Sequence, residues 1–184
     1  TVRVDGNWGR ADHPLVGMSV ISQADLIVVG THQRSGLRLL RAGSVSRSIL
    51  NHAPMSVACI PKPIATRMAG PVVRTCLRVL VAVDLDEPHG FAAAYGYSII
   101  NPGGTVRLVY NLVPSSRLGQ SNDSGQLAAE YEKSLHALAP SQTNGRNITT
   151  EVEVTESWET AESICAAAER FGADIICIGS HTRP

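Results

Sequence analysis

The sequence lacks the features that most directly mark nucleic-acid binding, membrane binding or hydrolytic catalysis. Sixteen Lys and Arg balance sixteen Asp and Glu, so the formal net charge is zero. No overall field therefore attracts nucleic acid or an anionic membrane, and we expect neither as a partner. No G-x-S-x-G elbow and no G-x4-G-K-[ST] loop occurs, so the usual marks of acyl transfer and of Walker-type phosphoryl transfer are missing.

Cysteine patterns and long apolar runs are missing as well. The four cysteines form no C-x-x-C pair and no metal-ligand pattern with the six histidines, so we predict buried thiols in a reducing compartment and no metal site. The longest apolar runs have the length of a strand, well short of the roughly 20 residues that span a bilayer. The first ten residues contain no apolar signal segment. These absences predict a cytoplasmic protein.

What the sequence does contain is an internal repeat. ADLIVVGTHQR at residues 24–34 matches ADIICIGSHTR at residues 173–183, and upstream TVRV with Trp8 matches EVEV with Trp158. Self-similarity of this kind is the mark of a duplicated structural unit. We therefore predict two related modules arranged in tandem.

Each copy of the repeat reads as part of an α/β fold, with a short strand, a helix and a continuous apolar run that ends at glycine. We predict that Leu26–Val29 and Ile175–Ile178 are interior strands, because runs that are apolar on both faces are typical of covered parallel sheets. Further elements are predicted between the copies, as strands over 77–83 and 106–112 and helices over 91–100 and 126–138. The predicted fold class is α/β, a Rossmann-like open parallel sheet with helices on both faces.

Proline and glycine mark the boundary between the two predicted modules. We predict that residues 1–63 are the C-terminal half of a first module, that 64–75 is a linker, and that 76–184 are the N-terminal three quarters of a second module. Since neither module contains every expected element, we expect segments that are absent from this sequence.

The segment that begins at Gly30 carries the strongest chemical signal. An apolar strand ends there, a loop rich in Gly, Ser and Arg follows, and a helix is predicted to begin at Ser44 and to end before Pro54. Free backbone amides at a helix start favour an anion, and Ser44 can cap the helix or bond a phosphate oxygen. The plainer interpretation is a turn with a helix cap.

This segment resembles the universal stress protein family, whose nucleotide loop reads G-x2-G-x9-G-[ST] after the fourth strand. Gly30, Gly43 and Ser44 match that spacing, while Gln33 replaces the second glycine and Thr182 replaces it in the second copy. The run GSVSRSILNHAPMSVACI is similar to the family's path through a helix into its fifth strand. The resemblance covers nearly the whole chain, as parts of a tandem pair.

The resemblance implies a cofactor and a site. VLVAVD, which ends at Asp84, corresponds to the family's first strand, whose Asp contacts adenosine; capping of the next helix is the alternative role for this side chain. The implied cofactor is ATP or AMP, with Mg²⁺ only in the case of ATP. Pairing through the fifth strand, as a dimer or within the tandem, is also implied. The predicted phosphate contacts are Gly30, Gly43, Ser44, Val45 and Ser46.

These features favour a universal stress protein that acts as an adenine-nucleotide-responsive binding module in stress response. Any ATPase activity is expected to be slow, because the sequence marks neither a base for the attacking water nor an arginine finger. Two alternatives stay open. One is a dimerisation scaffold that does not bind nucleotide, which Gln33 and Thr182 favour, and the other is the cytosolic regulatory domain of a transporter.

Overall fold

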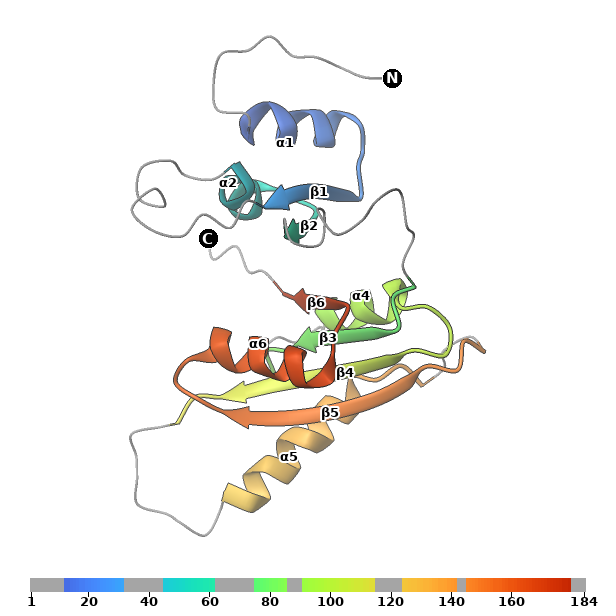
Figure 1. Cartoon of the computed structure of the whole chain (residues 1–184), viewed down its shortest axis with the longest axis vertical. Coiled ribbons are helices and arrows are strands. Elements are labelled where there is room, and N and C mark those ends of the chain that lie inside the picture. The colour runs from blue at the N-terminus through green and yellow to red at the C-terminus, as the bar shows by residue number, and fades with distance from the viewer. Residues whose placement is uncertain are drawn as a thin grey trace. The chain divides into compact units, whose positions relative to one another are not determined.

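The computed structural model of the chain describes residues 12–31, 45–61, 75–85, 91–114, 124–141 and 145–179. The chain divides into two compact units, Thr1–Val73 (unit 1) and Arg74–Pro184 (unit 2). Both units are built from parallel strands and helices (Figure 1). The predicted α/β class is therefore confirmed, whereas the assignment of the units to two modules of one family stays a prediction.

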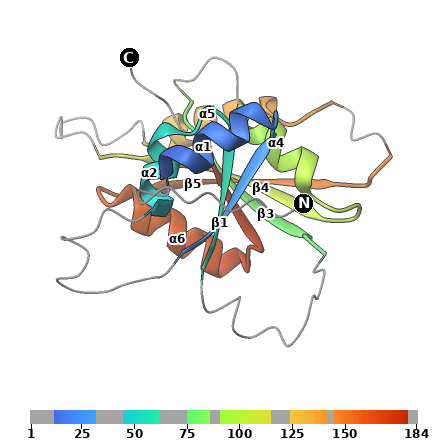
Figure 2. The same cartoon turned by 90° about the horizontal axis from the view of Figure 1, so that it is seen from above.

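Unit 1 is a strand pair with two helices, namely α1 (Asp12–Ile21), β1 (Leu26–Thr31), α2 (Val45–His52) and β2 (Ser56–Pro61). The strands are parallel, and Leu26 lies opposite Ser56. The two helices pack against each other (Figure 2). The Ser19 hydroxyl donates to the Val16 carbonyl at 2.7 Å, and its oxygen lies 3.5 Å from Met55 Sδ, so α1 contacts the residue that precedes β2.

Unit 2 contains a four-stranded sheet and three described helices. Its elements are β3 (Arg78–Ala82), α4 (Phe91–Ile99), β4 (Thr105–Leu112), α5 (Ser124–Ala137), β5 (Thr149–Glu156), α6 (Thr160–Phe171) and β6 (Ile175–Ile178). The strand order is β5-β4-β3-β6 and every neighbouring pair is parallel. The chain thus runs outward from β3 to β5 and then returns to the other side of β3, so that the direction of the order reverses between β3 and β6.

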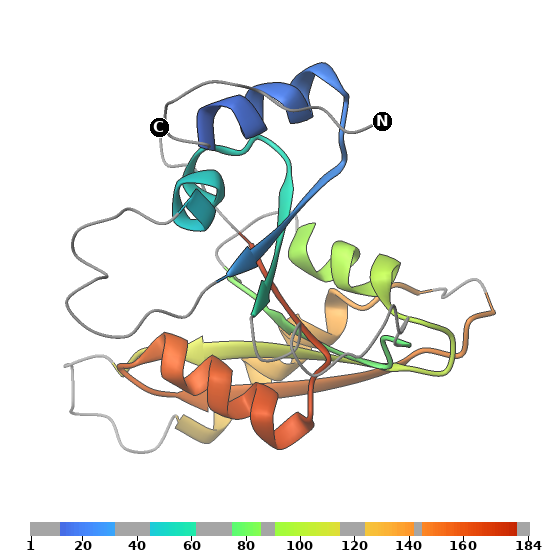
Figure 3. The ribbon, with the colours of Figure 1, turned by 45° about the horizontal axis from the view of Figure 1, so that its top comes forward.

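Two apolar clusters hold the sheet of unit 2 between its helices. Successive side chains of a strand point to opposite faces, and in β3 Val79 and Val81 pack with α4 and α5 while Leu80 packs with α6. Figure 3 shows α6 in front of the sheet and α5 behind it. The predicted covering of both sheet faces is present in this unit, because its strands are apolar on both sides.

The turn from α6 into β6 has a clear local cause. The helix ends at Gly172, whose φ of 66° lies in the left-handed region that favours glycine. Two residues later, one carboxylate oxygen of Asp174 accepts hydrogen bonds from the backbone amides of Leu77 and Arg78, both at 3.0 Å. These bonds tie the start of β6 to the start of β3 and set their parallel register.

The prediction that both repeated strands are interior is wrong for the described part of the chain. Among the described residues, β6 pairs only with β3, which places it at the edge of the sheet, and Ile178 is 66% exposed. In unit 1, β1 pairs only with β2 among these residues, and Val28 is 61% exposed. An apolar run predicts a strand that can be covered on both faces of a sheet. Whether that strand pairs with one neighbouring strand or with two depends on distant segments.

The prediction of buried thiols is also wrong in part. Cys59 and Cys165 are exposed, whereas Cys76 and Cys177 are half-buried. Burial, with a smaller contribution from nearby Cys76, raises the pKa of the Cys177 thiol to about 11. Cys59 lies on β2 and Cys165 on α6. The apolar residues around each cysteine in the sequence predicted burial, but too little of the described neighbouring structure covers these two positions. Within the described ranges, no helix has the length and apolar character needed to cross a lipid bilayer.

Candidate functional site

A small pocket lies at the carboxyl ends of β3 and β4, beside the start of α6. Its volume is about 240 Å³, and its lining residues are Ala82, Val83, Asp84, Val109, Tyr110, Asn111, Thr160 and Ile164. The backbone amide of Val83 donates to the Val109 carbonyl at 2.9 Å, so β3 and β4 stay paired up to the pocket. Open α/β sheets bind ligands outside the carboxyl ends of strands, where the strand order reverses. The order here reverses between β3 and β6, so the pocket lies next to the reversal, on the β4 side of β3.

Asp84 is the sequence-predicted site residue that this pocket contains. It is exposed and stands two residues beyond the end of β3. The pocket combines this carboxylate with apolar side chains from β3, β4 and α6. At about 240 Å³ it is smaller than the roughly 300–1,000 Å³ of pockets that enclose a whole drug-sized ligand. Its size therefore suits part of such a ligand rather than the whole of it.

Sequence reasoning missed two polar residues of the pocket, Asn111 and Thr160. The side-chain amide of Asn111 donates to Thr160 Oγ1 at 3.0 Å and to the Ser157 carbonyl at 2.9 Å. One signal was available: Asn111 is a polar residue near the carboxyl end of an apolar strand, as Asp84 is. Its partner Thr160, the first residue of α6, could not be found in this way, because the two residues are 49 positions apart in the sequence.

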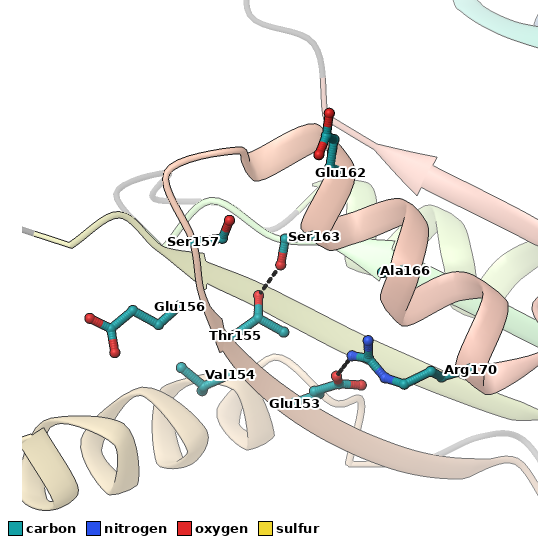
Figure 4. Close-up of a pocket in the computed structure, with 9 residues that line it drawn as sticks. All are labelled: Glu153, Val154, Thr155, Glu156, Ser157, Glu162, Ser163, Ala166 and Arg170. Carbon is teal, nitrogen blue, oxygen red and sulfur yellow. Dashed lines mark hydrogen bonds and ion pairs between the residues drawn. The ribbon is translucent and has the colours of Figure 1, made fainter.

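A larger hollow of about 580 Å³ lies between β5 and α6, and Figure 4 shows the side chains around it. Three of these side chains are the carboxylates of Glu153, Glu156 and Glu162. The cation of the hollow, Arg170, donates to Glu153 at 2.5 Å. Since the net charge of the lining is negative, the hollow repels phosphate groups. Its size alone does not make it a nucleotide site.

The described part of the predicted phosphate loop belongs to unit 1. Gly30 lies in β1 opposite Ile60, and Val45 and Ser46 open α2. The first turn of α2 contains no acidic residue, so no carboxylate there opposes an anion at the positive end of the helix dipole. The other two predicted loop residues, Gly43 and Ser44, lie outside the described residues. So do Gln33 and Thr182, which replace the family's second glycine.

Comparison with protein-family models gives a match to the Universal stress protein family over residues 2–61 and 76–184. The chain belongs to the universal stress protein family. Among solved structures, it is similar to a universal stress protein from Archaeoglobus fulgidus DSM 4304, with a TM-score of 0.61 and 21% sequence identity. That alignment covers 91% of this chain and 54% of the archaeal chain, so this chain spans about half the length of that relative.

A second solved structure, of a protein from Mycobacterium tuberculosis H37Rv, gives a TM-score of 0.40 and 10% identity, over 60% of this chain and 75% of that one. A search of curated proteins gives no match. The archaeal likeness supports the α/β fold of this universal stress protein, and the family match confirms the resemblance inferred from its loop. Neither comparison identifies a ligand.

The predicted site residues of this universal stress protein fall into two groups. Asp84 belongs to unit 2, whereas Gly30, Val45 and Ser46 belong to unit 1. Each group is the described part of a separate predicted site, the adenosine half-site of unit 2 and the phosphate half-site of unit 1. Within the described ranges, no three His, Cys, Asp or Glu side chains gather in a way that could hold a metal ion.

Proposed function

We propose that this universal stress protein is an adenine-nucleotide-responsive binding module that acts in the cytoplasmic stress response. The adenosine part of ATP or AMP would occupy the pocket beside Asp84. The observation that carries the proposal is the position of this carboxylate, at a pocket next to the reversal of the strand order. Carboxylates in such crevices accept hydrogen bonds from ribose hydroxyls, and the apolar side chains of the pocket suit the faces of a purine.

Separately, we propose that unit 1 binds a nucleotide of its own, whose phosphates contact Gly30, Gly43, Ser44, Val45 and Ser46. Two features support this part. The first turn of α2 contains no carboxylate, and a helix start offers free amides to an anion. The chain also contains only two lysines, Lys62 and Lys133, so no lysine cluster competes for phosphate. Mg²⁺ would accompany ATP but not AMP.

The proposed role is binding rather than rapid catalysis. Phosphoryl transfer to water needs a residue that positions the attacking water and a cation that stabilises charge in the transition state. The sequence marks neither. We therefore expect slow ATP turnover at most. Occupancy of the site would then follow the concentration of the nucleotide and would not be limited by its hydrolysis.

The test of the adenosine half-site is a calorimetric titration of adenosine and AMP into the full chain and into Asp84→Ala. Hydrogen bonds to a charged group contribute about 1.5–3 kcal/mol, so we expect the variant to bind roughly 10- to 150-fold more weakly. Glu132→Ala, which changes an exposed acid on α5, is the matched control and should bind as wild type does. Unaltered affinity in Asp84→Ala would place the nucleoside elsewhere.

The phosphate half-site is tested with ATP in three variants. Gly43→Val should abolish the contribution of the phosphates by steric exclusion, while Ser44→Ala should weaken binding by about 0.5–2 kcal/mol. Gln33→Gly should strengthen ATP binding or leave it unchanged, because it restores the family's bare backbone. Adenosine, which carries no phosphate, should bind all three variants as it binds wild type. If Gly43→Val keeps full affinity for ATP, the phosphates do not bind at this loop.

A second role, pairing with another module through β2, is favoured by the edge position of that strand. Among the described residues β2 pairs only with β1, and the large apolar side chain of Ile60 is 41% exposed. An apolar strand at the edge of a sheet tends to recruit another strand. If β2 pairs with a second copy, sedimentation velocity should show a dimer that Ile60→Lys dissociates. If the pairing is internal to the chain, the variant should instead unfold at a lower urea concentration. A monomer with unchanged stability would rule out both forms.

A further inference from the structure

Four side chains near the adenosine pocket form one directed chain of hydrogen bonds. Ser163 Oγ donates to Thr155 Oγ1 at 2.9 Å (Figure 4). Thr155 Oγ1 in turn donates to Asn111 Oδ1 at 3.0 Å, and the Asn111 amide donates to Thr160 Oγ1 at 3.0 Å. The register of β4 and β5 brings this chain together, because it pairs Asn111 with Thr155. Only its last two members, Asn111 and Thr160, line the pocket.

The direction of this chain follows from what each group can donate and accept. The Ser157 carbonyl can only accept, so the atom of Asn111 that lies 2.9 Å from it must be the amide nitrogen. The second amide hydrogen of Asn111 then points to Thr160, and the carbonyl oxygen points to Thr155. Asn111 has no hydrogen left to offer a ligand, since both of its amide hydrogens are engaged.

Thr160 is the last member of this chain of hydrogen bonds, and its hydroxyl hydrogen is not used within it. Its oxygen accepts from Asn111, and its own hydroxyl hydrogen has no acceptor among the described residues. A hydroxyl carries one hydrogen and two lone pairs, so the bond from Asn111 leaves this hydrogen to donate. The pocket therefore offers a donor from Thr160 as well as the Asp84 carboxylate.

We propose that Thr160 selects the ligand by donating a hydrogen bond to a ring nitrogen of the adenine base, and that Asn111 is the positioning residue that orients it. The inference rests on the proposed binding of adenosine. If the carboxylate of Asp84 takes the ribose hydroxyls, the base is the part of the nucleoside that is left for Thr160. Adenine ring nitrogens such as N3 and N7 are acceptors only, so they match a donor hydroxyl.

The experiment crosses protein variants with nucleoside analogues. Thr160→Val keeps the shape of the side chain but removes the donor, and should bind adenosine about 2- to 12-fold more weakly, the equivalent of one neutral hydrogen bond. Thr160→Ser keeps the hydroxyl and should restore binding. Thr149→Val, at an exposed position on β5, is the matched control and should bind as wild type does.

Three analogues, 1-deaza-, 3-deaza- and 7-deazaadenosine, each lack one ring acceptor. One of them should bind wild type more weakly by the same factor, and it should lose nothing further in Thr160→Val. If every analogue loses affinity equally in wild type and in Thr160→Val, no ring nitrogen is the acceptor and the proposal is wrong. Equal binding of adenosine by wild type and Thr160→Val would overturn it as well.

Asn111→Asp tests the positioning role. A carboxylate only accepts, so the Thr160 hydroxyl would turn to donate to it and would be lost to the ligand. This variant should therefore weaken adenosine binding as Thr160→Val does, and combining the two changes should add nothing. Additive losses would show that Asn111 does not act through Thr160. Thermal unfolding of each variant checks that the fold is intact.

A measurement without ligand separates this inference from the proposed function. In a nuclear magnetic resonance spectrum, Thr160→Val should shift one of the two Asn111 side-chain amide protons, because that proton loses its acceptor. No shift would overturn the hydrogen-bond chain. If wild type does not bind adenosine at all, the proposed function fails and the ligand role of Thr160 fails with it. If wild type binds but Thr160→Val is unaltered, only the role of Thr160 fails.

Discussion

The strands β1 and β6 come from the two copies of one sequence repeat, yet they have different neighbours. In unit 1, β1 pairs with β2, the strand that follows it in the chain. In unit 2, β6 pairs with β3, the first strand of that unit. The two copies together show that this apolar sequence can pair with a strand that follows it or with one that precedes it. Its residues specify a strand, and the rest of the unit determines which strand becomes its partner.

The two units also differ in how much apolar surface they bury. In unit 2, one cluster packs under α4 and α5 and another under α6. In the described part of unit 1, Ile49 is the one fully buried large apolar side chain, next to the buried Ser48. Since burial of apolar surface is the main favourable term in folding, unit 2 should be the more stable of the two.

The largest expected effect comes from removing a core side chain of unit 2. Leu108 is fully buried between the sheet and its helices, and Leu108→Ala should lower the free energy of unfolding by about 2–5 kcal/mol. Leu50→Ala, at an exposed position of α2 in unit 1, should change it by less than about 0.5 kcal/mol. Urea unfolding followed by far-ultraviolet circular dichroism, to which the helices of both units contribute, measures both. Equal losses would contradict the difference between the units.

Two helix glycines test the difference between the units further, because replacing each glycine by alanine should change stability with opposite sign. A Cβ at Gly96 in α4 would lie 2.6 Å from Val81 Cγ2, so Gly96→Ala should destabilise unit 2 by about 1–3 kcal/mol. A Cβ at Gly17 in α1 would meet nothing within 4 Å among the described residues. Gly17→Ala should therefore stabilise unit 1 by about 0.4–1 kcal/mol. Thermal unfolding of the two variants decides this, and a gain in Gly96→Ala would refute the close packing of α4 on β3.

A smaller effect is expected at alkaline pH, in unit 2 more than in unit 1. Burial raises the pKa of Cys177 to about 11 from its ordinary value of 9.0, so the folded state favours the neutral thiol. The stability from this preference is present below pH 9 and is lost as pH rises towards 11. Urea midpoints between pH 8 and pH 11 should fall, and Cys177→Ala should reduce the slope. An unchanged slope in that variant would assign the loss to other groups.

The sequence predicted local structure and the position of one candidate residue of the pocket, but not the contacts between distant segments. The repeated apolar runs predicted β1 and β6, and the end of the VLVAVD run predicted that Asp84 follows a strand. The bond between Asn111 and Thr160 was not predictable, because it depends on the parallel register of β4 and β5. The exposure of Ile178 was missed for the same reason, because burial depends on distant segments that a local apolar pattern does not identify.

The most direct test of the central claim is chemical-shift mapping of the full chain with AMP. AMP should shift the backbone amides of Asp84, Asn111 and Thr160 in a saturable way, and adenosine should reproduce these shifts. Shifts at Val45 and Ser46 should appear with AMP or ATP but not with adenosine, because only the nucleotides carry phosphate. Shifts confined to other residues, or none up to millimolar AMP, would contradict the assignment of the pocket beside Asp84 as the adenosine site.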